Sequence, residues 1–230
     1  MRIVAVADTH TFERDLGTLP EGDLLVHAGD MLRGGTLEEL GPMAEWFNAQ
    51  PHAHKIIVPG NHDVCFQTQP DEARALVDAT VLVDSGVTLG GLTFWGSPWQ
   101  PQHPDWGYHC PPESIGAKWA LVPAGTDVLI THTPGRGIGD RASGHGRVGC
   151  RALAEAGRRT QARMHLFGHV HQEGGAWLHD GRWQMNVTTW ESERAATVFD
   201  ITADEVRLIE VPPTDPMAVQ RAAADAAAAD

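Results

Sequence analysis

The stretch Ile-Ile-Val-Pro-Gly-Asn-His-Asp at positions 56–63 joins a short apolar run to four residues that suit a functional loop. An apolar run of this length is typical of a strand that is buried on both faces of a sheet. In parallel sheets, functional side chains gather in the loops beyond the carboxyl ends of the strands. The stretch therefore predicts a buried strand that ends in a site containing Asn61, His62 and Asp63.

The same pattern recurs four more times along the chain. Apolar runs at residues 3–7, 24–28, 128–130 and 164–167 each end in a small polar cluster. The clusters are Asp8 with His10, Gly29 with Asp30, Thr131 with His132, and Gly168 with His169 and His171. Since functional groups collect at the carboxyl edge of such sheets, we expect the five clusters to form one site.

The segments between these runs have helical spacing or hairpin character. Helices are predicted over residues 36–50, 70–79, 113–120 and 149–159. Gly41 and Pro42 should kink or restart the first of these helices, because proline interrupts the backbone hydrogen bonds of a helix.

Two hairpins are predicted later in the chain. One covers residues 80–95 with its turn at Gly90-Gly91, and the other covers residues 183–211 with its turn at Ala203-Asp204. Strand–helix alternation followed by hairpins predicts an α/β sandwich of mixed sheets.

The length of 230 residues fits one domain of ordinary size. We assign residues 1–211 to this domain. Residues 212–230 form an Ala-rich tail that ends in AAADAAAAD, a helix-forming composition without a clear apolar face. We expect this tail to be weakly ordered.

The charge balance is strongly acidic. Lys and Arg number 17 and Asp and Glu number 30, which gives a formal net charge of −13. Proteins that bind a nucleic-acid backbone usually carry the opposite sign, so we expect no stable nucleic-acid partner. Bound cations can reverse the field inside a site, so a small phosphorylated substrate fits this balance.

The remaining composition points to an intracellular setting. The three cysteines lie far apart and form no CxxC pattern, which argues against a disulfide framework and against a Cys-based zinc site. The first residues have no signal-peptide character, and no apolar stretch approaches the length of a membrane span. We therefore expect a cytoplasmic protein without membrane contact, either a monomer or a homodimer.

The five clusters together supply carboxylate, amide and imidazole groups, the ligands that Mn, Fe, Zn and similar divalent ions prefer. Asp8 and His10 would share one face of a strand that continued through them, and the same holds for His169 and His171. Asp30 is the natural candidate for a carboxylate that bridges two cations. Two metals at bridging distance can generate a hydroxide nucleophile and neutralise a phosphoryl group.

As a set, these clusters resemble the five signature blocks of the calcineurin-like metallophosphoesterases. The resemblance runs from Met1 to about Ile209. It implies a four-layer αββα sandwich of two mixed β-sheets flanked by helices, with a dinuclear site at the strand ends. It also implies two ligand sets that share one carboxylate: Asp8, His10, Asp30 and His171 for one metal, and Asp30, Asn61, His132 and His169 for the other.

Further stretches are similar to a subgroup of this family, which contains the class III cyclic-nucleotide phosphodiesterases and the vertebrate brain metallophosphoesterase-domain proteins. These stretches are residues 94–99, 118–120, 131–136 and 148–150. In some vertebrate members a Gly replaces the first His of the last block. This chain keeps His169, so we expect both metal positions to be filled.

Several other residues suggest roles around the metals. His62 directly follows a ligand, which favours a general acid or a phosphate contact over a purely supporting hydrogen bond. Asp63 should orient a ligand or cap the next helix. Arg136 is a candidate for binding a phosphate oxygen, and Trp99 is a candidate for contacting the substrate. The alternative for each is an ordinary packing or solvated role.

His103, Trp106 and Tyr108 share the Pro-rich stretch 98–112 with Trp99. This stretch is long enough to wall a pocket. Its Trp and His residues suit either stacking on a nucleobase or local packing, and the sequence favours neither.

The sequence therefore predicts an enzyme that hydrolyses small phosphodiesters or phosphomonoesters through a metal-bridging hydroxide. Cyclic nucleotides are one candidate substrate class. Mn and Fe are the expected metals, with Zn, Ni and Co as alternatives. The competing functions are a phosphoprotein phosphatase and a non-catalytic binding scaffold on the same fold.

Overall fold

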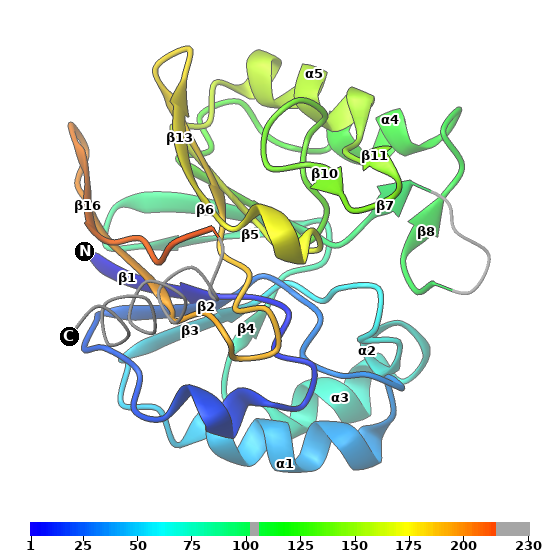
Figure 1. The fold of residues 1–230 in the computed structure, drawn as a ribbon, viewed down its shortest axis with the longest axis vertical. Coiled ribbons are helices and arrows are strands. Elements are labelled where there is room, and N and C mark those ends of the chain that lie inside the picture. The colour runs from blue at the N-terminus through cyan, green and yellow to red at the C-terminus, as the bar shows by residue number, and fades with distance from the viewer. Residues whose placement is uncertain (102–105, 215–230) are drawn as a thin grey trace, which may run out of the picture.

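The computed structural model describes residues 1–101 and 106–214 (Figure 1). His103 and the last sixteen residues, which include most of the predicted tail, lie outside these ranges. Pro212 and Pro213 lie inside them and accept hydrogen bonds from the Arg194 guanidinium. Within the described part, the chain forms two six-stranded sheets.

The first sheet is built around β1 (Arg2–Val6). It runs in the order β16 (Val206–Glu210), β15 (Thr197–Ile201), β1, β2 (Leu24–His27), β3 (His54–Ile57) and β4 (Thr80–Val81). The strands β1 to β4 are parallel, whereas β15 and β16 are antiparallel to their neighbours. The parallel strands all bring their carboxyl ends to the same edge.

The second sheet is also mixed. It runs in the order β13 (Gly175–His179), β14 (Arg182–Asn186), β12 (Met164–Phe167), β9 (Val128–Thr131), β6 (Leu92–Ser97) and β5 (Ser85–Leu89). The four central strands are parallel, and β13 and β5 pair antiparallel at the two edges. Two short pairs lie outside the sheets: β7 (Gln100–Pro101) with β8 (His109–Cys110), and β10 (Arg141–Ala142) with β11 (Gly146–Arg147).

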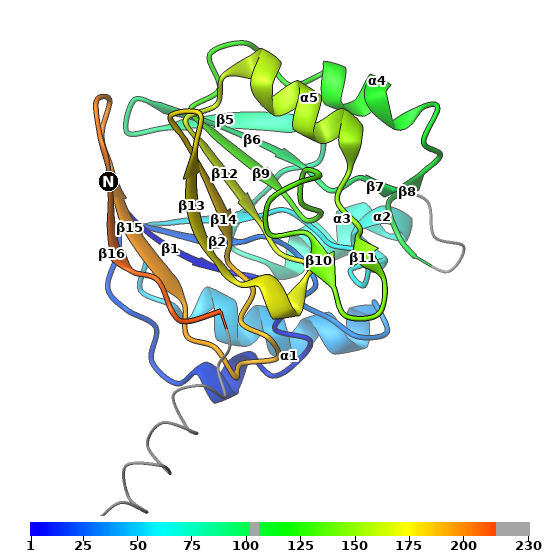
Figure 2. The same cartoon turned by 45° about the horizontal axis from the view of Figure 1, so that its top comes forward.

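Helices cover the two outer faces of the paired sheets (Figures 1 and 2). The first sheet is covered by α1 (Leu37–Asn48), α2 (Cys65–Thr68) and α3 (Pro70–Leu76), and the second by α4 (Ile115–Ala120) and α5 (Arg151–Thr160). Two short 3-10 helices, η1 (Glu13–Leu16) and η2 (His171–Glu173), complete the described elements. The four-layer sandwich of mixed sheets and flanking helices is confirmed.

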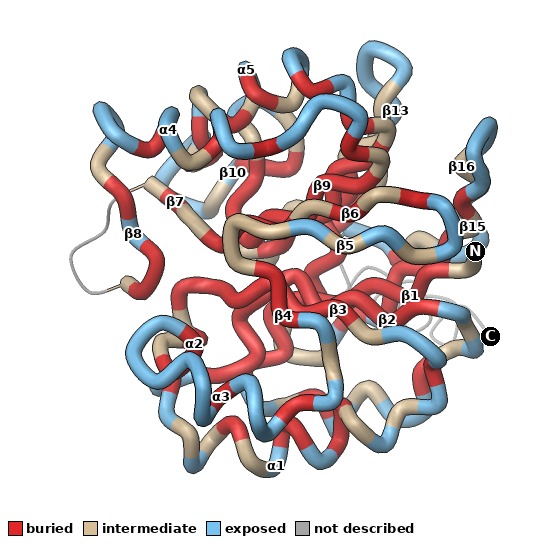
Figure 3. The backbone as a smooth tube through the Cα atoms, turned by 180° about the vertical axis from the view of Figure 1, so that it is seen from behind, coloured by how far each residue is buried: buried red, intermediate tan, exposed pale blue. Residues whose placement is uncertain are grey.

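The central strands are buried along most of their length (Figure 3), and alternation of their side chains divides the core into layers. On β1, Val4 and Val6 pack toward the helices, whereas Ile3 and Ala5 pack between the two sheets. Both sets are fully buried, which explains why the strands have continuous apolar sequences.

The restart predicted at Gly41-Pro42 does not occur. Helix α1 is continuous from Leu37 to Asn48 with Pro42 inside it. Pro42 lies on the exposed side, and the carbonyl of Glu38, which would have accepted the missing N–H, belongs to an exposed residue. Water can therefore satisfy that carbonyl, so the helix continues.

The second predicted hairpin is only partly right. β15 and β16 form a hairpin whose turn contains Ala203 and Asp204. Residues 183–186, however, belong to β14, which pairs with β13 and β12 in the other sheet. The first predicted hairpin, residues 80–95, is also partly right: β5 and β6 form a hairpin with Gly90 and Gly91 at its turn, whereas Thr80 and Val81 belong to β4 in the first sheet.

Within residues 1–101 and 106–214, no helix combines the length and the apolar character needed to cross a bilayer.

Candidate metal centre

The loops that follow five parallel strands meet at one edge of the sandwich. They bring eight side chains predicted from the sequence into one cluster: Asp8, His10, Asp30, Asn61, His62, His132, His169 and His171. All except His62, His169 and His171 are nearly fully buried.

One group of donors consists of Asp8, His10 and His171, whose ligand atoms all lie within 4.8 Å of one another. The Nε2 atoms of His10 and His171 are 3.3 Å apart, and His171 Nε2 is 3.7 Å from Asp8 Oδ1. Two nitrogens bound to one ion at about 2.1 Å in tetrahedral geometry lie roughly 3.4 Å apart. The observed spacing therefore fits shared ligation of one ion.

A second group is formed by Asp30, His132 and His169. His132 Nε2 lies 3.2 Å from Asp30 Oδ2, 3.2 Å from His169 Nδ1 and 3.0 Å from Asn61 Oδ1. Asp30 Oδ2 is also 3.8 Å from His10 Nε2. Asp30 thus lies between the two groups.

The condition that the strands continue through the ligands is not met. β1 ends at Val6, and Asp8, His10 and Thr11 adopt positive φ angles of 56°, 45° and 68°. His169 likewise has φ 69°. Left-handed residues turn the chain, so a loop rather than a strand pleat brings these side chains together.

Tertiary hydrogen bonds hold the loop after β1 in this conformation. The N–H groups of Asp8, His10 and Thr11 donate to the carbonyl oxygens of Gly29, Asp30 and Met31 at 2.8–3.1 Å. A left-handed conformation costs an L-residue roughly 1–2 kcal/mol. This cost is offset by contacts with a segment about twenty residues away.

Two glycines give the carboxylates room. A Cβ on Gly60 would lie 2.2 Å from Asp30 Oδ1, and a Cβ on Gly168 would lie 2.7 Å from Asp8 Oδ2. Both separations are far below any van der Waals contact. Glycine at these positions is therefore required by the approach of the ligands.

Backbone carbonyls fix the orientation of three imidazoles. The Nδ1 atoms of His10, His62 and His132 lie 3.0, 2.8 and 2.9 Å from the carbonyl oxygens of Leu32, Arg33 and Ala28. A carbonyl can only accept, so Nδ1 carries the proton and donates in each case. This leaves Nε2 as the nitrogen that can bind a metal or meet a substrate.

Asp63 organises the loop that supplies these carbonyls. Its carboxylate accepts the N–H groups of Gly60, Asp30, Met31 and Leu32 at 2.7–3.0 Å. Burial raises the pKa of Asp63 to about 7, the charge of Asp30 acts in the same direction, and the N–H donors oppose both. Asp63 orients the ligand loop, one of its two predicted roles.

The titration of the cluster also suits cation binding. Burial raises the pKa of Asp30, but the charge and hydrogen bond of His132 outweigh burial and hold that pKa well below its usual range. Burial lowers the pKa of His169 to about 3, and His132 adds to this effect. A carboxylate and a neutral imidazole are the forms that bind metals.

His132 behaves differently from His169. Burial lowers its pKa, but the charge of Asp30 outweighs burial and raises it to about 9. Its Nε2 faces Asp30, His169 and Asn61 at close range. His132 Nδ1 already donates to a carbonyl, so Nε2 is the nitrogen that can bind a cation. A cation at this place would also be within reach of the ligand atoms of Asp30, His169 and Asn61, so this set of oxygen and nitrogen ligands fits a divalent metal.

A cavity of about 560 Å³ adjoins the cluster. Besides His62 and several ligands, its lining includes Pro101, Trp106, Ala142, His145 and Val148. The Trp106 ring lies edge-to-face on His169, with centroids 5.0 Å apart and an interplanar angle of 87°.

Neither of the two residues predicted to contact substrate is among the described residues that line this cavity. The Trp99 indole donates from Nε1 to Asp84 at 2.8 Å, and Lys118 lies over its ring at 3.7 Å from the centroid. Trp99 therefore packs between the short strands and α4. Tyr108 also packs against it, at 5.7 Å between centroids.

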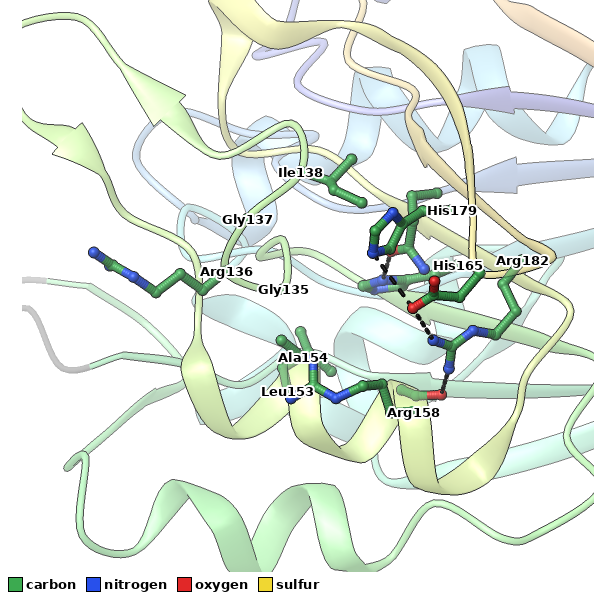
Figure 4. A pocket seen from close by; sticks show the side chains of 13 residues that line it. Gly135, Arg136, Gly137, Ile138, Leu153, Ala154, Arg158, His165, His179 and Arg182 are labelled. Carbon is green, nitrogen blue, oxygen red and sulfur yellow. Dashed lines mark hydrogen bonds and ion pairs between the residues drawn. The ribbon is translucent and has the colours of Figure 1, made fainter.

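Arg136 lines a different cavity, of about 290 Å³, between α5 and the β13–β14 hairpin (Figure 4). Its guanidinium donates to the carbonyl of Arg147 at 3.0 Å and points away from the other labelled side chains. Arg182 donates to the carbonyl of Gly157 at the opposite end of this cavity.

A supporting loop at residues 187–194 has no recognisable pattern in the sequence. Thr189 donates from N and Oγ1 to the carbonyl of Ala7, both at 2.8 Å, and Glu191 N donates to the carbonyl of Asp8 at 2.9 Å. Trp190, Glu191 and Ser192 all have positive φ angles. Only the fold brings this loop beside Asp8, so no local pattern could have identified it.

Carboxylate, amide and imidazole donors gathered at the carboxyl edge of two packed sheets define an α/β sandwich protein whose donor cluster fits divalent metals. The comparison with protein families identifies this class more narrowly. A family model described as calcineurin-like phosphoesterase matches residues 1–173, and the chain belongs to this family. Membership implies metal-dependent hydrolysis of phosphoesters.

Individual relatives agree with this assignment. Metallophosphoesterase domain-containing protein 1 of Homo sapiens is 35% identical over 224 residues, covering 86% of this chain and 67% of that protein. A UPF0046 protein of Caenorhabditis elegans is 36% identical over 190 residues, covering 76% of this chain and 65% of that protein. The chain thus spans about two thirds of the length of these relatives.

A solved structure shares the fold at low sequence identity. The protein TT1561 of Thermus thermophilus superposes with a TM-score of 0.62 at 13% identity, over 91% of this chain and 98% of that chain.

Proposed function

We propose that the chain hydrolyses small phosphoesters with two divalent metal ions. The observation that carries this proposal is the position of Asp30, whose Oδ2 lies 3.2 Å from His132 Nε2 and 3.8 Å from His10 Nε2. A carboxylate between two donor groups supports a pair of ions that share it.

Seven side chains would hold the two ions. Asp8, His10, Asp30 and His171 would bind one, and Asp30, Asn61, His132 and His169 the other. Oxygen and imidazole donors suit Mn or Fe, with Zn, Ni and Co as alternatives. Such a pair, when bound, activates water as a nucleophile and neutralises charge on the phosphoryl group.

His62 would supply a proton to the departing oxygen. It lines the cavity, and its Nδ1 donates to the Arg33 carbonyl at 2.8 Å. This hydrogen bond fixes the ring and leaves Nε2 available to a substrate. A general acid placed in this way contributes roughly 10²–10⁴-fold where the leaving group is a poor one.

A small ester suits the cavity better than a phosphoprotein. The cavity of about 560 Å³ falls in the size range of sites for small organic molecules. The formal charge of −13 would also repel an acidic phosphopeptide. We therefore rank the phosphoprotein phosphatase second, and the non-catalytic scaffold third because every ligand position is kept.

Metal loading and turnover test the proposal together. We expect two equivalents of manganese per chain by elemental analysis, and hydrolysis of bis-p-nitrophenyl phosphate that disappears on chelation and returns with metal. Asp30→Asn should abolish turnover in a protein that remains folded by circular dichroism. One equivalent or none in folded protein would contradict the two-metal proposal, and full loading without turnover on any ester would favour the scaffold.

A further inference from the structure

The cavity beside the cluster has an apolar wall, which we define as Pro101, Trp106, Ala142 and Val148. The wall comes from the end of β7, the segment before β8, and the hairpin β10–β11 with the residue that follows it. It shares one cavity with Asp30, His62 and His169, so a ligand at the metals would also meet apolar side chains.

Hydrogen bonds from two arginines hold the hairpin part of this wall. Arg147 donates to the buried carboxylate of Asp140 and to the Gly137 carbonyl, and Arg136 donates to the Arg147 carbonyl at 3.0 Å. The N–H of Val148 donates to the Asp140 carbonyl at 2.9 Å. These guanidinium groups are therefore engaged in holding the wall.

Trp106 connects the wall to the metal ligands. Its ring lies edge-to-face on His169 at 5.0 Å. Such contacts fix the orientation of an indole, and an ordered aromatic face binds planar organic groups well. A planar group in contact with Trp106 would thus lie next to a phosphoryl group at the metals.

We propose that the apolar wall binds one uncharged, planar organic group of a phosphodiester. This inference rests on the proposed phosphoesterase function and narrows its substrate class. A diester has a second organic group to place against the wall. A monoester instead carries a second negative charge near neutral pH, and placing a charged oxygen against apolar side chains costs desolvation energy.

Two diesters with the same leaving group test the wall directly. Phenyl p-nitrophenyl phosphate and methyl p-nitrophenyl phosphate both release p-nitrophenolate, so they differ only in the group that is retained. Burial of a phenyl group against aromatic and aliphatic side chains predicts a kcat/KM ratio of phenyl to methyl of about 10 or more. Correction for the solution reactivity of each ester isolates the binding contribution.

Variants test whether the phenyl-to-methyl kcat/KM ratio depends on the side chains of the wall. Trp106→Ala should bring the ratio close to 1, and Val148→Thr, which replaces a methyl group by a hydroxyl at nearly constant shape, should reduce it several-fold. Val87→Thr makes the same change in a partly buried valine of β5 and should leave the wild-type ratio intact. If Trp106→Ala loses metal, the test of whether the wall binds the phenyl group rests on the phenyl-to-methyl ratio of wild type and of Val148→Thr.

Binding of inert analogues separates this inference from the proposed function. Diphenylphosphinate and dimethylphosphinate have P–C bonds that cannot be hydrolysed, and calorimetry on manganese-loaded protein should show about tenfold tighter binding of the diphenyl compound. Tighter binding of diphenylphosphinate in a protein that hydrolyses neither ester would refute the hydrolase proposal but support the proposed role of the wall. If the protein hydrolyses both esters with a phenyl-to-methyl kcat/KM ratio close to 1, in wild type and in the variants alike, the proposed role of the wall is wrong and the hydrolase proposal stands.

Discussion

At the scale of single residues, the cluster shows how backbone groups prepare side chains for chemistry. The carbonyls of Ala28, Leu32 and Arg33 belong to one loop, and each accepts the Nδ1 proton of a different histidine. Asp63 holds that loop by accepting four N–H groups. A purely local change in the loop would therefore affect three imidazoles at once.

His62 gives the prediction that belongs to this scale. Metals do not protonate a departing oxygen, and p-nitrophenolate leaves without a proton whereas a nucleoside alkoxide does not. His62→Ala should therefore lower kcat/KM by about 10²-fold or more for a nucleoside leaving group and far less for nitrophenol. The measurement is kcat/KM for both esters in both proteins at matched metal content.

Metal content is the control for His62. If His62→Ala binds as much manganese as wild type and loses the same factor on both esters, its role is phosphate binding or orientation. Loss of metal would make His62 a support for the ligands, which its proximity to His10 and Asp30 also allows.

At the scale of elements, close approach between segments sets the requirement for glycine. A Cβ on Gly168 would lie 2.6 Å from the Ala7 Cβ and 2.7 Å from Asp8 Oδ2, where the loop after β12 crosses the end of β1. A Cβ on Gly157, in the middle of α5, would meet nothing within 4 Å. The two positions therefore form a matched pair.

Alanine should have opposite effects at these two glycines. Gly168→Ala should push Asp8 from its place and weaken manganese binding by about 10-fold or more, by analogy with changes that disturb metal-ligand support. Gly157→Ala should raise the free energy of unfolding by about 0.4–1 kcal/mol, because alanine is the better helix former. Metal titration and urea unfolding of both variants measure the contrast. Equal metal affinity in the two variants would contradict the steric argument.

The elements also show what sequence can and cannot predict. The strands before Asp8, Asp30, Asn61, His132 and His169 were predictable because burial on both faces leaves a continuous apolar run. The left-handed turns at the ligands were not, because they depend on hydrogen bonds between distant segments. The helix restart predicted at Pro42 failed for a related reason, because the exposure of Pro42 depends on how the helix packs.

The cluster can be predicted from the sequence more completely than the cavity beside it. All eight cluster residues could be identified from the polar endings of the apolar runs. The cavity lining could be predicted only in part: the stretch 98–112 was expected to wall a pocket, and Pro101 and Trp106 from it line the cavity, whereas Ala142 and Val148 reach the cavity through a hairpin that no local pattern marks. Trp99 and Trp106 look equivalent in sequence, and only packing places Trp106 on His169.

At the scale of the whole molecule, buried histidines make stability depend on pH. His165 lies between the second sheet and α5 at 5% exposure, with contacts to Thr131 at 2.7 Å and Gln184 at 3.0 Å. Burial lowers its pKa to about 4, with partial opposition from Gln184. The unfolded chain takes up this proton near pH 6.5, so the contribution is complete above that pH and is lost as pH falls toward 4.

The difference between wild type and His165→Gln isolates this proton. Between pH 7 and 4.5, wild type should lose about 2–3 kcal/mol more of its free energy of unfolding than the variant. His54→Gln, at an exposed position of β3, is the control and should follow wild type. Parallel pH curves for wild type and His165→Gln would show that His165 is not held neutral by the fold.

Arg194 links the end of the described chain to the metal centre. Its side chain is 2% exposed, and its guanidinium donates to the carbonyl oxygens of Thr188, Pro212 and Pro213 at 2.7, 2.8 and 3.1 Å. Burial lowers its pKa to about 10, which still leaves the group charged. The family model ends at residue 173, yet this arginine clamps the loop whose N–H groups hold Ala7 and Asp8.

Loss of the Arg194 hydrogen bonds should therefore weaken metal binding, although Arg194 is not one of the proposed ligands. Arg194→Leu leaves three carbonyls without their donor and should lower the free energy of unfolding by about 2–4 kcal/mol. A chain that stops at residue 211 lacks two of these carbonyls and should show a smaller loss. Both should bind manganese more weakly than wild type, because the loop beneath Asp8 loses its anchor. Urea unfolding of the metal-free proteins separates stability from affinity, and wild-type metal affinity in a destabilised Arg194→Leu would confine the clamp to a structural role.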